Sequence, residues 1–228
     1  MAKAWLGIDL GTSAVKAVLV DPGGGLLATG QGARALQAPE PLAAEQSTEA
    51  WWGATQRALA ACLEAAGPVD VAGVGLTGQK HALLLLDAER VPLGPAWLWA
   101  DGRARQACHD LAAIEDRLAQ RTGAPALPGY VLPKWLLWRS RHPERLPRVA
   151  HLLFAKDWLR LRLTGELATD PTEAGASQLW HAPSGRWVDS RCRAVGIDPA
   201  WLPRVAPSNA ETGRVTAEAG RQTGLPPG

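Results

Sequence analysis

The sequence predicts an α/β protein whose mixed sheet begins as a three-stranded antiparallel meander and whose second half is more helical. Three apolar, strand-like runs at residues 5–10, 14–20 and 26–32 are joined by short turns, of which Asp21–Gly25 is the strongest. A helical period appears only after them, whereas a doubly wound sheet would alternate strand and helix from the start. Prolines at five positions between 125 and 147 break up the later helices.

The first predicted helix follows Ser47, whose hydroxyl suits an N-cap, and Glu49 is favourable in its first turn. Apolar residues recur at helical spacing from Trp51 to Cys62, and Gly67-Pro68 ends the helix. Strands are expected at 69–76, 82–86 and 96–99, and a helix at 103–121, closed by Gly123. Shorter helices are expected at 134–141 and 156–163, followed by short helices and loops beyond 189 and a linker-like end at 223–228.

Composition excludes several classes of function. The 228 residues, 46% apolar and 20% charged, suit a globular chain with a real core. The 24 basic and 22 acidic residues form no block of like charge, so neither nucleic acid nor a membrane surface is an indicated partner. Three scattered cysteines suggest no disulfide framework or zinc site. Asp9 lies too early for a secretory signal, and no apolar run approaches a membrane span, so a cytoplasmic protein is expected.

The stretch from Asp9 to Ser13 carries the first chemical signal. A carboxylate late in a strand is followed by Gly11, Thr12 and Ser13, whose turn offers backbone N–H groups and hydroxyls to a phosphate. Asp9 suits a hydrated Mg²⁺ ion, which prefers one or two carboxylates together with substrate phosphates. The motif is short, and a plain hairpin with an incidental aspartate is the alternative.

Several stretches in a fixed order give a family resemblance. "GIDLGTSAVKAVLVD" resembles the first phosphate motif of the actin-like ATPase superfamily, and specifically of the FGGY carbohydrate kinases. "VAGVGLTGQKHALLLLDAERVPLGPAWLWADGR" resembles the sugar-site strand pair of the xylulokinases within that family. "EQSTEAWW", "LPKWLLW" and "LFAKDWLRLRLTGELATDPTEAGASQLW" follow the family's order as well. The resemblance implies an actin-like (ribonuclease-H-like) domain over residues 4–228.

The resemblance also implies a function. FGGY kinases close two domains over a cleft, the N-terminal domain supplying most sugar contacts and the C-terminal domain most nucleotide contacts. Residues 1–228 are expected to be the N-terminal domain alone, since the Gly-rich aspartate motif with the general base is not found in them. ATP-dependent phosphorylation of a ketose such as D-xylulose is implied, with this chain as the sugar-binding half, inactive alone. A non-catalytic sugar-binding module, or a kinase of glycerol, ribulose or gluconate, is the alternative.

Site residues are carried over by position. The resemblance implies that Asp9 faces ATP and Mg²⁺, through water, with Gly11, Thr12 and Ser13 at the γ-phosphate. Lys16 is expected to be a solvated side chain. A small-molecule sugar and a separate C-terminal kinase domain are the implied partners, and a homodimer stays open.

The sugar is expected to contact Gln79, Lys80 and His81, so that Asp9 and His81 border one cleft. Lys80 departs from the methionine usual in xylulokinases. A surface lysine at position 80 and a core histidine at position 81 are the alternative. Asp101 and Arg103 are expected to orient the sugar, with a structural Asp–Arg pair as an equal alternative.

Four further residues are given structural roles. Trp97 and Trp99 are expected in the core, with an apolar wall for a sugar as the alternative. The segment around Lys134 is taken as structural, and Asp170 as the cap of a short helix.

Overall fold

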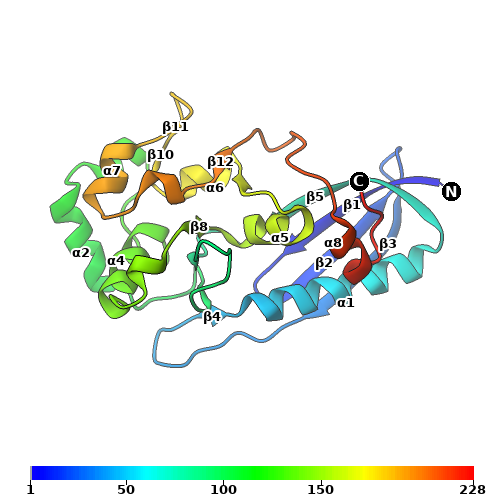
Figure 1. Cartoon of the computed structure of the whole chain (residues 1–228), viewed down its shortest axis with the longest axis horizontal. Helices are drawn as coiled ribbons and strands as arrows, with labels where there is room; N and C mark the ends of the chain where they lie inside the picture. Colours follow the sequence, from blue (N-terminus) through cyan, green and yellow to red (C-terminus); the bar gives the residue numbers. More distant parts are fainter. Residues whose placement is uncertain (1) are drawn as a thin grey trace.

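The computed structural model describes residues 2–228. Its main sheet has four strands in the order β3-β2-β1-β5 (Figure 1). Strands β1 (Ala2–Leu10), β2 (Ala14–Val20) and β3 (Leu26–Ala33) form an antiparallel meander. Strand β5 (Val69–Gly78) then pairs with β1 in parallel. The predicted meander and the mixed character of the sheet are confirmed.

Helix α1 (Thr48–Ala66) connects β3 to β5 across one face of the sheet. Its N-cap is Ser47, whose hydroxyl accepts a hydrogen bond from the backbone N–H of Ala50 at 3.1 Å, as expected from the sequence. The backbone of the helix packs directly against the backbone of β3. A Cβ atom added to Gly32 would stand 2.0 Å from the carbonyl oxygen of Ala54, so glycine is required by the close approach.

Alternation along β1 separates the two faces of the sheet. Leu6, Ile8 and Leu10 are buried and belong to a core shared with α1, α5 (Ala155–Thr164) and α8 (Ala217–Thr223). Asp9 and its odd-numbered neighbours point to the opposite, more open face. These helices therefore cover one face of the sheet (Figure 1), and the alternation along β1 puts Asp9 on the other face.

The rest of the chain forms a second, more helical region with its own core around Trp135, Phe154 and Cys192. Its helices are α2 (Arg105–Ile114), α3 (Leu118–Thr122), α4 (Val131–Arg141), α6 (Pro171–Ala176) and α7 (Asp189–Ala194), with 3₁₀ turns at Leu146–Arg148 and Pro199–Trp201. Its short strands pair as β4 (Glu45–Gln46) with β7 (Ala96–Trp97), β6 (Leu84–Leu86) with β8 (His151–Leu153), β9 (Ala168–Thr169) with β12 (Arg204–Val205), and β10 (Trp180–His181) with β11 (Arg186–Trp187).

The expected continuous helix at 103–121 is wrong, because the chain leaves the helix at Glu115 and resumes only at Leu118. Its expected end at Gly123 is confirmed, since Gly123 caps the second helix in the left-handed conformation. The carboxylate of Glu115 pairs with Arg121 at 2.9 Å and with Arg191 of α7 at 3.5 Å. A contact with a distant element thus accompanies the break, and local spacing does not reveal it.

The linker-like end at 223–228 is also wrong. Leu225 is 3% exposed and belongs to the main core, and the backbone N–H of Gly228 donates to the carbonyl of Val215 at 3.0 Å. The expected strands at 82–86 and 96–99 are shorter, at Leu84–Leu86 and Ala96–Trp97. Within residues 2–228, no helix has both the length and the apolar character needed to cross a bilayer.

Candidate functional site

The candidate site lies where β1 and β5 end side by side. Asp9 and Leu10 stand in register with Thr77 and Gly78, and the backbone N–H of Gln79 donates to the carbonyl of Leu10 at 3.0 Å. The loops after both strands therefore meet outside the carboxyl ends of parallel neighbours, which is the usual place for a ligand in such sheets.

These loops enclose a pocket of about 350 Å³. Its lining residues are Asp9, Gly11, Thr12, Gly78, Gln79, Lys80, His81 and Trp99. The pocket thus brings together the predicted phosphate-facing residues, apart from Ser13, and all three residues of the predicted sugar-contacting loop. Ser13 is exposed and does not line it.

A hydrogen-bonded network joins the two loops. The hydroxyl of Thr12 donates to Gln79 Oε1 at 3.2 Å and accepts from Trp99 Nε1 at 3.0 Å. Gln79 Nε2 donates in turn to Gln46 Oε1 at 3.2 Å, and Gln46 Nε2 donates to the carbonyl of Thr12 at 2.8 Å. Trp51 Nε1 completes the network by donating to Gln46 Oε1 at 2.9 Å. A displacement of the loop after β1 is therefore expected to disturb the hydrogen bonds of the loop after β5, and the reverse.

Sequence reasoning missed one member of this network, Gln46, and gave another, Trp99, a place at the site only as the alternative to the core. Gln46 is buried just before α1, and its partners lie far away in the chain, so no local pattern reveals it. Trp99 was expected in the core, but it is 52% exposed and lines the pocket, while Trp97 is buried as expected. The core assignment of Trp99 is wrong, because the strand ends at Trp97 and the chain then turns outward.

His81 has an unusual backbone, with φ near +60°, a region that non-glycine residues seldom occupy. Its ring stacks on Tyr130, with centroids 4.3 Å apart and planes 12° from parallel. Burial, reinforced by the charge of Lys134, lowers the pKa of His81. The imidazole is therefore neutral near pH 7, with one nitrogen that donates and one that accepts. The neighbouring Lys80 is exposed.

Asp101 and Arg103 form a structural pair outside the pocket. Arg103 Nη2 lies 2.6 Å from Asp101 and 2.6 Å from Glu45, and its guanidinium stands 3.9 Å from the ring centre of Trp97. Asp101 also accepts from the backbone N–H of Ala44 at 3.1 Å. This geometry matches the alternative of a structural Asp–Arg pair, and a sugar contact by these residues stays a prediction.

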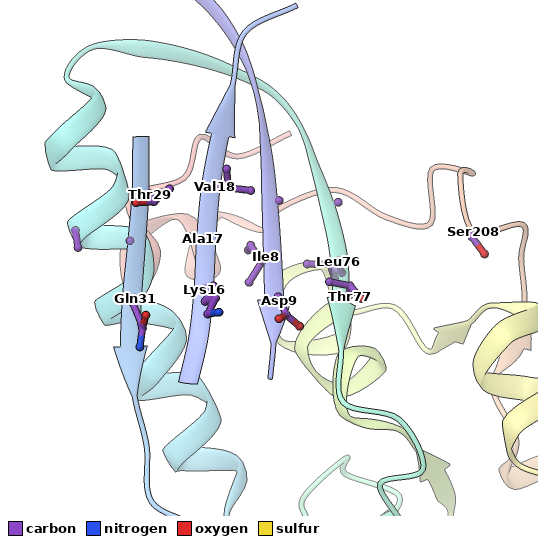
Figure 2. Close-up of a pocket in the computed structure, with 14 residues that line it drawn as sticks. Ile8, Asp9, Lys16, Ala17, Val18, Thr29, Gln31, Leu76, Thr77 and Ser208 are labelled. Carbon is purple, nitrogen blue, oxygen red and sulfur yellow. The ribbon is translucent and has the colours of Figure 1, made fainter. Parts of the chain in front are cut away.

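Asp9 also borders a second, larger groove of about 870 Å³ on the open face of the sheet (Figure 2). Figure 2 shows Asp9 beside Lys16 of β2 and Thr77 of β5, its neighbours in register. Lys16 is exposed, as expected. Of the predicted site residues, Asp9 alone belongs to both the groove and the pocket, so its carboxylate stands where the two spaces adjoin.

A buried charged cluster lies beside the end of β5, where a Cβ atom added to Gly78 would stand 3.5 Å from Cβ of Lys156. Asp170 caps α6, as expected, by accepting from the backbone N–H of Thr172 at 2.8 Å, and it pairs with Lys156 at 2.9 Å. Glu173 is 1% exposed, and its Oε2 has no hydrogen-bond partner within residues 2–228. Burial raises the pKa of Glu173 to about 7, against the opposing charge of Lys156.

No group of three or more His, Cys, Asp and Glu side chains in the described part of the chain is arranged to hold a metal ion. A divalent ion beside Asp9 would therefore need water and phosphate oxygens for most of its ligands. Mg²⁺ commonly binds in this manner, because it keeps several waters and takes one or two carboxylates.

The fold and the place of the pocket define an actin-like ATPase domain, and solved structures agree. The xylulose kinase from Rhodospirillum rubrum matches with a TM-score of 0.93 at 28% identity, covering 97% of this chain and 47% of that chain. A xyloylose kinase from Brucella ovis matches with a TM-score of 0.92 at 31% identity, covering 98% and 46%. The predicted fold class is therefore confirmed.

The family follows from sequence. The model of the FGGY family of carbohydrate kinases, N-terminal domain, matches residues 4–228. The chain belongs to this family. The xylulose kinase of Escherichia coli strain K12 is 36% identical over 222 residues, which cover 97% of this chain and 46% of that protein. The chain thus spans about half the length of the curated relatives it matches.

Proposed function

We propose that the chain is the sugar-binding half of an ATP-dependent carbohydrate kinase that phosphorylates a ketose such as D-xylulose. The observation that carries the proposal is the single pocket shared by Asp9, Thr12, Gln79 and His81. A kinase must bring a phosphate-facing carboxylate and a hydroxyl-bearing substrate to one place, because phosphoryl transfer depends on alignment and charge neutralisation.

In this proposal Asp9 holds Mg²⁺ through water, and Gly11, Thr12 and Ser13 lie at the γ-phosphate. The carboxylate of Asp9 fits this role because it is partly exposed at the pocket and has Lys16 and Thr77 as its neighbours in register. Bound Mg²⁺ and ATP supply the phosphoryl group and neutralise its developing charge. Thr12 is held in place by Gln79 and Trp99, which sets the phosphate loop against the sugar.

The sugar in this proposal lies against Gln79, Lys80, His81 and Trp99. A neutral imidazole and a lysine offer donors and an acceptor for sugar hydroxyls, and the exposed indole ring offers an apolar wall. The network fixes the amide of Gln79, so its orientation is set before the sugar arrives.

The general base that accepts the proton of the sugar hydroxyl is expected in the domain that the relatives carry beyond the matched half. The half-length match supports this division. Alone, the chain would therefore bind sugar without turning it over.

The test is isothermal titration of the purified chain with D-xylulose, D-ribulose, glycerol and D-gluconate, followed by a kinase assay. The assay is run with the chain alone and with the C-terminal half of a xylulose kinase added. Ketose binding without turnover alone, and turnover after addition, would support the proposal. Binding without turnover in both assays would favour a non-catalytic sugar-binding module. Absence of binding to any of the four compounds would refute the sugar site.

A matched pair of variants localises the binding. His81→Ala is expected to weaken sugar binding at least about tenfold, since a well-placed polar contact is lost. His181→Ala is the control, because His181 is exposed in β10 and its imidazole pairs with the hydroxyl of nearby Ser184. Equal affinities for the two variants would remove His81 from the site.

A further inference from the structure

Lys134 of α4 is completely buried, and its ammonium group is bound by backbone carbonyls instead of carboxylates. Its Nζ donates to the carbonyl of His81, to that of Trp97 at 2.9 Å and to that of Leu98 at 2.8 Å. The first carbonyl belongs to the loop after β5, and the other two lead directly to Trp99. One side chain thus ties together two segments that both contribute to the pocket lining, at His81 and at Trp99.

Three carbonyl acceptors require three N–H donors, which an ammonium group has and a neutral amine lacks. Burial lowers the pKa of Lys134 to about 7, while the nearby charge of Asp101 raises it. A charge kept in so dry a place without a directly bonded carboxylate is unfavourable unless its hydrogen bonds are fully made. The three carbonyls therefore explain why a lysine can be buried at this position, because they accept from all three N–H donors of its ammonium group.

The first turn of α4 touches His81 in two ways. Lys134 binds its carbonyl, and the ring of Tyr130, the residue that precedes the helix, stacks on its imidazole at 4.3 Å. His81 keeps a left-handed backbone, with φ near +60°, which persists only when neighbours over-determine it. These contacts fix both the backbone and the ring of His81.

We propose that Lys134 is a positioning residue that sets His81 and Trp99 at their places in the pocket. It does not line the pocket itself, so it acts through the carbonyls it binds. The consequence for sugar affinity rests on the proposed function, whereas the consequence for the geometry of His81 does not.

The first experiment reads that geometry directly by NMR of the chain with ¹³C-labelled histidine and ¹⁵N-labelled tryptophan. His81→Gln and Trp99→Phe assign the two reporter signals. In Lys134→Met, which keeps the length but has no donor, both signals are expected to move, and the signals of His109, His151 and His181 are expected to stay. Lys134→Gln, which keeps two N–H donors, is expected to give intermediate shifts.

Arg139→Met is the matched control on the same helix. Arg139 donates to the carbonyl of Val195 at 2.8 Å, away from the pocket, so its loss removes a side chain-to-carbonyl bond of the same kind. The reporter signals of His81 and Trp99 are expected to be unchanged in this variant.

The second experiment measures D-xylulose affinity for the same variants. Lys134→Met is expected to weaken binding about tenfold to a hundredfold, because small displacements of positioned groups are costly. Lys134→Gln is expected to lose less affinity than Lys134→Met. Arg139→Met is expected to bind D-xylulose as tightly as the unmodified chain. If the unmodified chain binds no sugar, the proposed function fails while the NMR signals still decide the positioning role.

Three results would overturn the inference. The first is a folded Lys134→Met chain whose His81 and Trp99 signals match those of the unmodified chain. The second is a shift of all histidine signals alike, which would indicate a general loosening. The third is a failure of both Lys134 variants to fold, which would assign Lys134 to the stability of the whole domain.

Discussion

Glu173 offers a test of the electrostatics beside the pocket that does not depend on any ligand. It is 1% exposed, and burial raises its pKa to about 7 from a usual value of 4.5. Between these values the folded chain retains a proton that the unfolded chain has lost. The free energy of unfolding therefore falls as pH rises through this window, because ionisation favours the unfolded state.

The size of the effect follows from the shift. The difference between 7 and 4.5 is 2.5 pH units, and each unit is 1.36 kcal/mol, which gives an upper bound of about 3 kcal/mol. Glu173→Gln keeps the shape of the side chain and stays neutral at every pH. Relative to the unmodified chain, this variant is expected to gain up to about 3 kcal/mol of stability between pH 4.5 and pH 7.

The assay is urea denaturation at half-unit steps from pH 4.5 to pH 8, with reductant present for the three free cysteines. The measured quantity is the difference in unfolding free energy between the two proteins at each pH, in which titrating groups that do not interact with Glu173 largely cancel. Glu218→Gln is the control, because that exposed side chain has a lowered pKa and titrates below the window.

A difference that stays constant with pH would refute the reasoning, since it would mean that Glu173 ionises alike in the folded and unfolded chains. A difference that shrinks between pH 4.5 and pH 7 would refute it as well, because a raised pKa makes the variant increasingly more stable than the unmodified chain across that range.

Three further predictions concern packing and the pocket. Gly32→Ala is expected to lower the unfolding free energy by about 2 kcal/mol or more, because its Cβ meets the carbonyl of α1 at 2.0 Å. Gly53→Ala, inside α1 and facing only the flexible side chain of Arg57 at 3.4 Å, is expected to raise the unfolding free energy by about 0.5–1 kcal/mol in the same denaturation experiment; a loss equal to that of Gly32→Ala would contradict the packing. Lys80→Met is expected to weaken D-gluconate binding more than D-xylulose binding in calorimetry, since it removes a cation from the pocket; equal changes would leave Lys80 without a role in selection. Trp99→Phe removes the donor to Thr12 and is expected to weaken sugar binding about threefold to tenfold with little change in melting temperature, and an unchanged affinity would show that the donor is dispensable.

The elements with strong local signals were predictable from the sequence. The meander follows from apolar runs separated by tight turns, and α1 follows from its N-cap, apolar period and Gly-Pro end. The pocket was predictable in outline, because parallel neighbours place their carboxyl ends together and both loops carry polar residues.

What the sequence did not reveal depends on contacts between distant segments. The break between α2 and α3 coincides with Glu115 pairing to Arg191, some 76 positions later. The burial of Leu225 depends on a core built by the first strands, and the Gln46 network joins four separate segments. Trp99 was misplaced because indole rings are common in cores, and its exposure is decided by the outward turn after Trp97.

The close contact between α1 and the backbone of β3 at Gly30 and Gly32 has a mechanical consequence. Where Gly30 and Gly32 let the helix rest on the strand backbone, there is no layer of side chains whose rotamers can slide or repack. Helix α1 and the sheet must then move together as one rigid body. Any opening or closing around a ligand has to be absorbed by the loops at the rim and by the helical region beyond them.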